Sequence, residues 1–511
     1  MRKLQFLAYA LIFSIIISFI PSIGFADEIN PTEAADDALL KVLGILQEND
    51  SIYAREFALR RDLARIMVRI SNFDNVFEKT EANYFTDVSD SDPDAKYINA
   101  AYSLGYMGGI DGEFQPDAPI SMYQFAKLAS IALGYGEIAI TQGGYPAGYI
   151  NTAQAAGVFK GIKFSSAEGI TKNEFIKLLN NLLEADTITL TSAGDRITYT
   201  NYKKDTLLWK NFSTYFIKGV MEADAFSDIL FENPRPYSGE VIIDGERYLT
   251  DNKNLNKYVG CSVKAYIKSE NEKETLIHVS NDRNSEITEF HSEKLSSITK
   301  GELIYYNEDD SQVKFSLSPV AALIYNGRQT PFSTDLIKNA NGDVVLIDNN
   351  SDNEIDVIKI TNYTEILVQN VSANAKAIYD GLSNTSIDLS GYKLGESLLI
   401  IKNGVSSKFS DIASDDIILM SQSLGKEKLI SLYVSDKKVS GTISEINEDD
   451  IVLNGQAYPR SYSKRDINIL GDEVTLYLDM FGKVVISKTV NDIVYGYLYR
   501  IKKIGLNNTR V

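Results

Sequence analysis

One short acidic segment carries side chains whose spacing could bind a calcium ion. The candidate ligands each offer an oxygen atom: Asp348, Asn350, Asp352 and Asp356. Hard Ca²⁺ prefers such oxygens, and extracellular calcium is plentiful enough to fill weak sites. The segment also fits a polar hairpin turn between predicted strands at 344–347 and 357–360, because Asn353 replaces the glycine usual in calcium loops. Structural calcium is therefore a hypothesis, and we expect no other cofactor.

Few other residues could support catalysis. The sequence has two histidines, His278 and His291, and one cysteine, Cys261. One cysteine forms neither an internal disulfide nor a cysteine-based zinc cluster, and two histidines leave few ways to build a Ser-His-Asp triad. His278 alternates with apolar neighbours, which predicts an outward strand position. Since no P-loop, G-x-S-x-G or H-E-x-x-H motif is present, we expect no enzyme.

The composition narrows the class of protein and its partners. Lys and Arg number 51 against 69 Asp and Glu, which gives a net charge of −18. Bulk attraction to nucleic acid is therefore excluded, and any anionic partner must be recognised by local cations. The 511 residues are 44% hydrophobic, so the chain can bury several cores, at roughly 150 residues for each domain.

The N-terminus predicts a secretory signal peptide at 1–26. Arg2 and Lys3 precede a charge-free apolar stretch, and small residues precede the expected cleavage after Ala26. An uncleaved membrane anchor is the alternative, since about 20 apolar residues span a bilayer. Pro21 favours the signal peptide because it interrupts a helix. We expect an exported protein with no membrane association after cleavage.

Three copies of one helical pattern occupy 34–72, 83–134 and 135–185. In each copy, a glycine suited to a helix C-terminus precedes the first apolar residue of a second helix by 18 to 20 residues. The glycines are Gly44, Gly105 and Gly157, and the apolar residues are Leu63, Phe125 and Phe175. Apolar residues then recur at i, i+3, i+4 and i+7. Because one helix pair buries too little surface alone, the three copies should share a core.

The second copy carries an ordered set of motifs before its second helix. They are Phe85-x-Asp87-Val88, Gly105-x-x-x-Gly109 and Gly112-x-Phe114-x-Pro116, followed by a helix entry at Ser121. This order resembles the S-layer homology (SLH) domain, although Asp94 stands where the family often has an aromatic residue. The third copy resembles a variant of the module and the first matches mainly at its ends. Together they cover about 34–185, roughly a third of the chain.

The resemblance implies a surface anchor. SLH domains usually occur as triplets that bind secondary cell-wall polymers of bacteria, often through pyruvylated sugars. Arg60 stands at the arginine position of the first copy, and a guanidinium offers a bidentate fork to a pyruvyl carboxylate. Lys172 stands there in the third copy and Met122 in the second. The resemblance thus implies one intact pocket, one weakened pocket and one that lacks its cation.

Four polar residues near these helix entries are further candidates for polymer binding. They are Thr171, Glu174, Ser121 and Asp62. Each has a structural alternative. Ser121 with Gln124, and Thr171 with Glu174, fit capping boxes, in which the paired side chains satisfy the first N–H groups of a helix. Asp62 fits a first-turn acid favoured by the helix dipole.

Beyond Asp186 the pattern changes to short strands and tight turns. Three turns, Asp244-Gly245, Asn326-Gly327 and Asn454-Gly455, each precede another glycine and a strand by 15 or 16 residues. This repeat predicts β modules at 236–285, 286–365, 366–438 and 439–511, the third weakly marked, after a bridging segment at 186–235. Trp209 should be a buried anchor in that bridge. A strand beginning at Val494 suggests that the last module is incomplete.

The expected fold class is multidomain: an N-terminal helical SLH-like triplet followed by a string of small β-barrel or sandwich modules. The favoured function is a noncatalytic surface protein, secreted to the cell wall or S-layer and anchored noncovalently to secondary cell-wall polymer. One alternative is a wall-anchored polysaccharide hydrolase with its carboxylates in the β region. Another is a structural S-layer subunit. The sequence predicts no oligomeric state.

Overall fold

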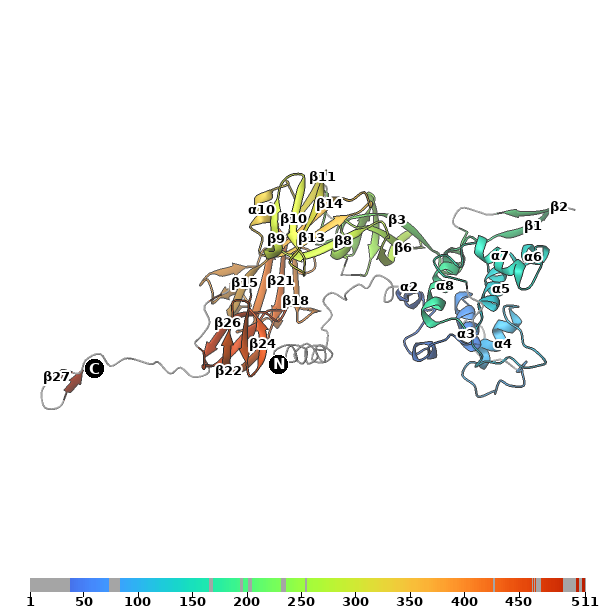
Figure 1. Cartoon of the computed structure of the whole chain (residues 1–511), viewed down its shortest axis with the longest axis horizontal. Coiled ribbons are helices and arrows are strands. Elements are labelled where there is room, and N and C mark those ends of the chain that lie inside the picture. The colour runs from blue at the N-terminus through green and yellow to red at the C-terminus, as the bar shows by residue number, and fades with distance from the viewer. Residues whose placement is uncertain are drawn as a thin grey trace, which may run out of the picture. The chain divides into compact units, whose positions relative to one another are not determined.

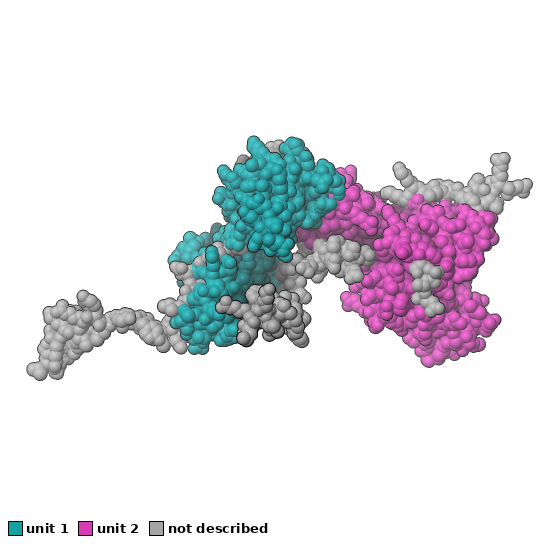
Figure 2. Space-filling model, viewed as in Figure 1, with its two compact units in different colours: residues 1–25, 225–238, 286–511 teal, residues 26–224, 239–285 magenta. Residues whose placement is uncertain are grey.

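The computed structural model describes residues 37–72, 83–164, 169–193, 196–200, 205–230, 236–252, 255–425, 428–461, 463, 465, 470–489, 502–504 and 508–510. The predicted signal peptide and the predicted strand from Val494 lie outside them. The chain divides into two units, coloured in Figure 2. One comprises Ala26–Asp224 and Gly239–Ser285, and the other Met1–Phe25, Ala225–Ser238 and Glu286–Val511. No helix within the described ranges is long and apolar enough to cross a membrane.

Short helices form the N-terminal part of the first unit (Figure 1). They are α2 (Ala38–Val42), α3 (Arg60–Ile70), α4 (Ala95–Ser103), α5 (Met122–Ala132), α6 (Gly136–Thr141), α7 (Ala147–Ala155) and α8 (Lys172–Glu184). The apolar faces of α3, α5 and α8 pack into one core, in which Leu63, Phe125 and Phe175 are at most 1% exposed. The rings of Phe125 and Phe175 meet edge to face at 6.1 Å.

A ring of three backbone hydrogen bonds joins the helical copies. The N–H of Ala58 donates to the carbonyl of Ile170, that of Ile170 to Ile120, and that of Ile120 to Ala58, at 2.9, 2.9 and 3.0 Å. Each residue is fully buried and lies two positions before α3, α5 or α8. The ring relates the three helices by an approximate threefold arrangement. Their first residues therefore occupy matching places, which makes the three helix entries directly comparable.

A small closed barrel completes the first unit. Its strands are β3 (Thr214–Ala223), β4 (Glu240–Ile243), β5 (Glu246–Thr250), β6 (Ser262–Glu270) and β7 (Lys273–Asn281), closed in the order β3-β4-β5-β7-β6. The boundary predicted at 236 was wrong, because β3 lies within the predicted bridge of 186–235. This strand pairs with β6 along seven residues, a long-range contact that no turn motif marks. The bridge also contains a hairpin of β1 (Thr189–Ala193) and β2 (Arg196–Thr200), and the helix α9 (Leu207–Phe212).

The helical part and the barrel share side-chain contacts. Tyr266 of β6 belongs to the helical core, and its hydroxyl donates to Glu184 at the end of α8 at 2.5 Å. Leu207 and Leu208 of α9 are buried in the same core. Trp209 was predicted to be the buried anchor, but it is 37% exposed and meets Tyr215 edge to face. The anchoring side chains are therefore its two leucine neighbours.

Three antiparallel-rich sheets form the second unit (Figure 1). The first contains β8 (Glu286–His291), β9 (Leu295–Ile298), β10 (Glu302–Tyr306), β11 (Gln312–Tyr325), β12 (Arg328–Thr330), β13 (Gly342–Asp348) and β14 (Glu354–Asn362), with α10 (Thr334–Lys338) beside it. The second contains β15 (Thr364–Ser372), β16 (Ala377–Asp380), β17 (Ser386–Asp388), β18 (Leu398–Lys402), β19 (Val405–Ser406), β20 (Ile417–Gln422) and β21 (Ile430–Ser435). The third contains β22 (Lys438–Ile446), β23 (Asp450–Leu453), β24 (Gln456–Pro459), β25 (Glu473–Leu478) and β26 (Val484–Thr489). A further hairpin joins β27 (Lys502–Ile504) and β28 (Asn508–Arg510).

Each of the three sheets encloses its own apolar core. Leu367 and Ile417 of the second sheet pack against Tyr477 and Val485 of the third. The predicted fold class, a helical triplet followed by small β modules, is confirmed.

The repeated turns have a common structural role. Asp244, Asn326 and Asn454 each adopt a positive φ before glycine, as a tight hairpin turn requires. Each side chain also accepts a hydrogen bond from a neighbouring strand: Asp244 from Val220 N–H at 2.8 Å, Asn326 from Asn362 N–H at 2.7 Å and Asn454 from Thr442 N–H at 3.3 Å. In each turn, an aspartate or asparagine therefore both adopts the turn conformation and accepts a hydrogen bond from a neighbouring strand.

Candidate binding site around Arg60

Arg60 lies where the first helical copy meets the second. It is the first residue of α3, and its Nε donates to the carbonyl of Phe114 at 2.8 Å. Its Nη2 donates to the carbonyl of Gly108 at 2.7 Å. The guanidinium also lies over the Phe114 ring, with its central carbon 4.7 Å from the ring centre. Two carbonyls and one ring therefore fix the plane and the direction of this cation.

The SLH-like motifs build the loop that holds Arg60. Both oxygens of Asp87 accept backbone hydrogen bonds at 2.7 Å, one from Phe114 and one from Gln115. The ring of Phe85 contacts that of Phe114 with centroids 5.2 Å apart. Gly109 needs its missing side chain, because a Cβ would lie 2.4 Å from the carbonyl oxygen of Glu113. The motif residues thus position the two carbonyls that orient Arg60.

The electrostatic setting leaves Arg60 able to bind an anion. Burial lowers its pKa, and the nearby Asp87 carboxylate partly opposes this effect. A guanidinium remains charged at neutral pH despite such a shift. Its Nη1 group makes no hydrogen bond with any residue that the structure describes. One oriented donor group is therefore available to a carboxylate or another oxyanion.

The two equivalent positions differ from Arg60. Lys172 begins α8, is half-buried, and makes no side-chain ion pair with the described part of the chain. Its backbone N–H donates to Glu56 of the first copy at 2.9 Å, just as Arg60 N–H donates to Ala118 of the second. Met122 begins α5 and is 2% exposed. Two of the three helix entries therefore present a cation, and one presents a buried thioether.

The other polymer-binding candidates are occupied in capping their helices. Ser121 and Gln124 form a reciprocal capping box at 3.1 and 3.2 Å. In the box of Thr171 and Glu174, the Thr171 N–H and hydroxyl donate to the Glu174 carboxylate at 3.0 and 2.7 Å. These contacts match the structural alternative for both pairs.

Asp62 is also committed to local structure, since it is 1% exposed. Its carboxylate accepts from Leu59 N–H and from the Ser51 hydroxyl, both at 3.0 Å. A buried carboxylate with these partners fixes the entry of α3 directly beside Arg60. Asp62 is therefore placed to position Arg60, and the structure gives it no exposed surface for contact with a polymer.

A stripe of arginines on α3, which no sequence motif marked, pairs with aspartates of both the first and the second copy. Arg61, Arg65 and Arg69 recur every four residues and so share one helix face. Arg65 is paired with Asp94 at 2.5 Å and with Asp50 at 3.2 Å. Arg69 pairs with Asp50 at 2.7 Å, and Arg61 contacts Asp94 at 3.2 Å. The i, i+4, i+8 spacing of the arginines was visible in the sequence. The aspartates that pair with them lie outside α3 and could not be assigned from that spacing.

A fall in pH should weaken the ion pairs between Asp50 and the arginines of this stripe. Burial alone would raise the pKa of Asp50, but its hydrogen bonds to Arg69 and to Gln47 N–H lower it overall. A lowered folded-state pKa means that the stabilisation is present at neutral pH and is lost as pH falls below about 4. We expect urea unfolding, followed by Trp209 fluorescence, to show a progressive loss of stability as the pH falls below about 4. Asp50→Asn should flatten this loss, and an unchanged pH profile in that variant would contradict the assignment.

The predicted calcium segment forms a turn whose oxygens accept backbone N–H groups. Asp348 accepts from Ser351 at 2.7 Å and from Asn353 at 2.8 Å, and Asp356 accepts from Asn349 at 3.0 Å. Asn350 and Asp352 accept from Asp352 N–H and Glu354 N–H, both at 2.9 Å. Within the described ranges, no group of three or more acidic, histidine or cysteine side chains is arranged to hold a metal ion. Calcium binding by these residues stays a prediction.

The two histidines belong to strands outside the helical copies, His278 to β7 and His291 to β8. His278 was predicted to face outward, but burial and the charge of Lys264 lower its pKa to about 4. It is therefore neutral and partly covered beside the Tyr266 ring. Burial and then Lys483 lower the pKa of His291 to about 4 as well.

Comparison with known proteins supports the class that this geometry suggests. The S-layer homology domain family matches residues 84–125, which include Asp87, Phe114 and the entry of α5. The matched segment supplies the loop that orients Arg60. The chain is thus an SLH-containing protein of the bacterial cell surface, and it is secreted and associated with the cell wall.

A second comparison extends the similarity beyond the helical unit, by which we mean helices α2 to α8 of the first unit. The "Middle cell wall protein" of Brevibacillus brevis (strain 47 / JCM 6285 / NBRC 100599) is 23% identical over 433 residues, which cover 74% of this chain and 41% of the relative. The chain therefore matches well under half of that protein's length. A crystal structure of a multidomain protein with nucleic acid binding domains from Streptococcus pneumoniae TIGR4 covers 55% of this chain and 75% of its own. At 10% identity and a TM-score of 0.10, that similarity carries no argument.

Proposed function

We propose that the helical unit anchors the protein noncovalently to a secondary cell-wall polymer, and that Arg60 binds a carboxylate of that polymer. The observation that carries the proposal is the guanidinium held by the Phe114 and Gly108 carbonyls with Nη1 left over. Its orientation is fixed before the ligand arrives, which reduces the entropy lost on binding. A pyruvyl group on a wall sugar supplies the matching planar carboxylate.

The first residues of α8 and α5 should contribute unequally to polymer binding. Lys172 offers a point charge without the fixed fork of a guanidinium, so it should bind a carboxylate more weakly than Arg60 does. The matching position in the second copy is Met122, which has no charge and should not recognise a carboxylate. One strong and one weak cation suit a protein with a net charge of −18, because local cations must overcome its overall repulsion of an anionic polymer.

The β modules are proposed to be displayed from this anchor without catalytic activity. The rival hydrolase requires two available carboxylates that face each other across a cleft. A pocket in the second unit is lined by Glu365 and Asp380. However, Asp380 accepts hydrogen bonds from Leu367 N–H at 3.1 Å and Leu382 N–H at 2.9 Å through one oxygen, and from Ser383 through the other. It is committed to backbone contacts with β15 and with its own loop, and is poorly placed to transfer protons.

Retention on purified cell-wall sacculi tests the anchor. The full chain should bind intact sacculi and should be released after extraction of the secondary polymer. The extraction is a better test than removal of 27–185, because that deletion would expose Leu207, Leu208 and Tyr266, which belong to the helical core. Equal retention before and after extraction would refute polymer anchoring.

A further inference from the structure

Two cations come together where the third helical copy meets the barrel. A Cβ on Gly161 would lie 3.1 Å from Lys177 Nζ and 3.9 Å from Arg283 Nη2. Lys177 belongs to α8 and Arg283 follows β7 of the barrel, so separate elements bring these nitrogens to one place. All three residues belong to the first unit. The space beside this glycine is therefore bordered by two positive charges.

The pair has no acidic partner among the residues that the structure describes. Lys177 Nζ donates to the carbonyl of Gly161 at 2.8 Å, which leaves its charge unopposed. The carboxylate of Asp282 is already bound, because it accepts from Lys218 Nζ at 2.8 and 3.1 Å and from the backbone N–H of Arg283 at 2.9 Å. Two neighbouring cations repel each other, and an external anion between them would remove that repulsion.

The loop that carries Gly161 is fixed before any ligand arrives. The side-chain amide of Asn181 on α8 donates to two carbonyls of this loop, at 2.9 and 3.0 Å. The rings of Phe159 and Phe164 meet edge to face with their centroids 5.1 Å apart. Gly161 itself has a φ of +70°, a conformation that favours glycine. A ligand bound here would therefore lose little free energy in ordering the loop.

The accessible charge on this surface is positive. Lys160 and Lys163 are exposed in the same loop, and neither forms an ion pair within the described ranges. Arg283 is exposed and Lys177 is half-buried, so a ligand can reach both from solvent. Carboxylate and phosphate oxygens accept strong, charge-assisted hydrogen bonds from guanidinium and ammonium groups. The ligand that matches this surface is therefore an oxyanion.

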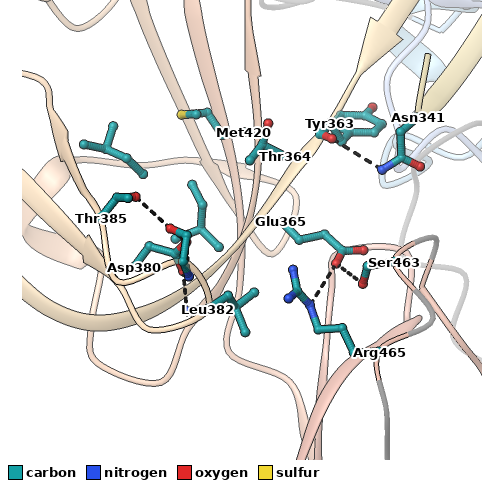
Figure 3. A pocket seen from close by; sticks show the side chains of 13 residues that line it. Asn341, Tyr363, Thr364, Glu365, Asp380, Leu382, Thr385, Met420, Ser463 and Arg465 are labelled. Atoms are coloured by element: carbon teal, nitrogen blue, oxygen red, sulfur yellow. Dashed lines mark hydrogen bonds and ion pairs between the residues drawn. The ribbon is translucent and has the colours of Figure 1, made fainter. Parts of the chain in front are cut away.

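The pocket of the second unit matches an oxyanion less well (Figure 3). Its volume is about 370 Å³, and its lining includes two carboxylates, Glu365 and Asp380. The lining cation, Arg465, already lies 3.7 Å from Glu365. A surface with this balance of charges repels an anion.

We infer that Lys177 and Arg283 bind an oxyanion of an anionic cell-wall polymer, either a carboxylate or a phosphodiester, so that polymer contact extends from the helical copies onto the barrel. The choice of a wall polymer rests on the anchoring function proposed above. The site is separate from the helix entry at Lys172. Lys177 follows that residue by five positions, which places it on a different side of α8 at about 3.6 residues per turn.

Calorimetry on the full chain with two soluble polymers tests the inference. Poly(glycerol phosphate) carries phosphodiesters and polygalacturonate carries carboxylates, so the polymer that binds identifies the oxyanion. The wild type should bind at least one of them, and Arg283→Gln should weaken that binding by roughly threefold or more. Arg283→Lys keeps the charge and should retain most of the affinity. Arg247→Gln makes the same change on β5, where Arg247 already pairs with Glu240 at 2.9 Å, and should leave the affinity unchanged.

Three outcomes would overturn the inference: no binding of either polymer, equal affinity in Arg283→Gln and the wild type, and an equal loss in Arg247→Gln. The thermal unfolding midpoint shows whether each variant is folded. If Arg283→Gln unfolds, Lys177→Gln replaces it, because this change removes the other cation of the pair. Unchanged affinity in folded Lys177→Gln would then overturn the inference, and a reduced affinity would support it.

Failure of this inference is distinguishable from failure of the anchor. Sacculus retention that does not depend on the secondary polymer refutes the anchor, whereas binding of a soluble polymer that depends on Arg283 still supports this site. Polymer-dependent retention that is equal in wild type and Arg283→Gln keeps the anchor and overturns the site.

Discussion

Replacing Arg65 by methionine should lower the free energy of unfolding of the helical unit by about 3 kcal/mol. Arg65 is 9% exposed and pairs with Asp94 and Asp50, which are themselves buried. Removal of the Arg65 cation leaves two buried carboxylates with less positive charge nearby to offset the cost of their burial. The loss falls at the lower end of the range for broken buried ion pairs, because Arg61 and Arg69 still contact the same carboxylates. Urea unfolding followed by Trp209 fluorescence measures it.

Lys41→Met provides the matched control for this prediction. It also removes a cation from the helical unit, but Lys41 is half-exposed and pairs with Asp37 on the surface. Such a pair contributes less than about 1 kcal/mol. A double-mutant cycle of Arg65→Met with Asp94→Asn should show coupling, because the two side chains are in direct contact. Equal losses in Arg65→Met and Lys41→Met, or no coupling in the cycle, would show that the stripe does not stabilise the unit.

Replacing Arg60 by methionine should weaken binding to secondary cell-wall polymer at least tenfold, or by roughly 1.4 kcal/mol. The variant removes the oriented guanidinium, and the fold should tolerate the change because methionine occupies the matching position at Met122. Arg60→Lys should give an intermediate affinity, since an ammonium keeps the charge without the planar fork. Lys172→Met should cost less than Arg60→Met. Calorimetry with soluble polymer measures all three, and thermal unfolding shows whether each variant is folded.

The helical unit was largely predictable because its signals are local. Apolar residues at helical spacing predicted the buried faces of α3, α5 and α8, and the hydroxyl-to-acid spacing at Thr171 and Glu174 predicted a capping box. The motif around Asp87 and Phe114 predicted an SLH-like module, which the family match supports. The position of Arg60 at a helix entry also followed from the sequence.

The contacts between elements could not be predicted in the same way. The partners of Arg65, the pairing of β3 with β6 and the acceptor carbonyls of Arg60 all join residues far apart in the chain. Asp94 illustrates the problem, since it replaced an expected aromatic residue and turned out to be an ion-pair partner of the arginine stripe. Trp209 was assigned to a core by residue type, yet its leucine neighbours bury more of their surface.

The most direct test of the account compares wild-type protein and Arg60→Met on polymer with and without its pyruvyl groups. If Arg60 binds the pyruvyl carboxylate, removal of that group should weaken the wild type at least tenfold and should change the affinity of Arg60→Met much less. An equal loss in both proteins would show that Arg60 and the pyruvyl group act independently, and it would contradict the proposed anchor.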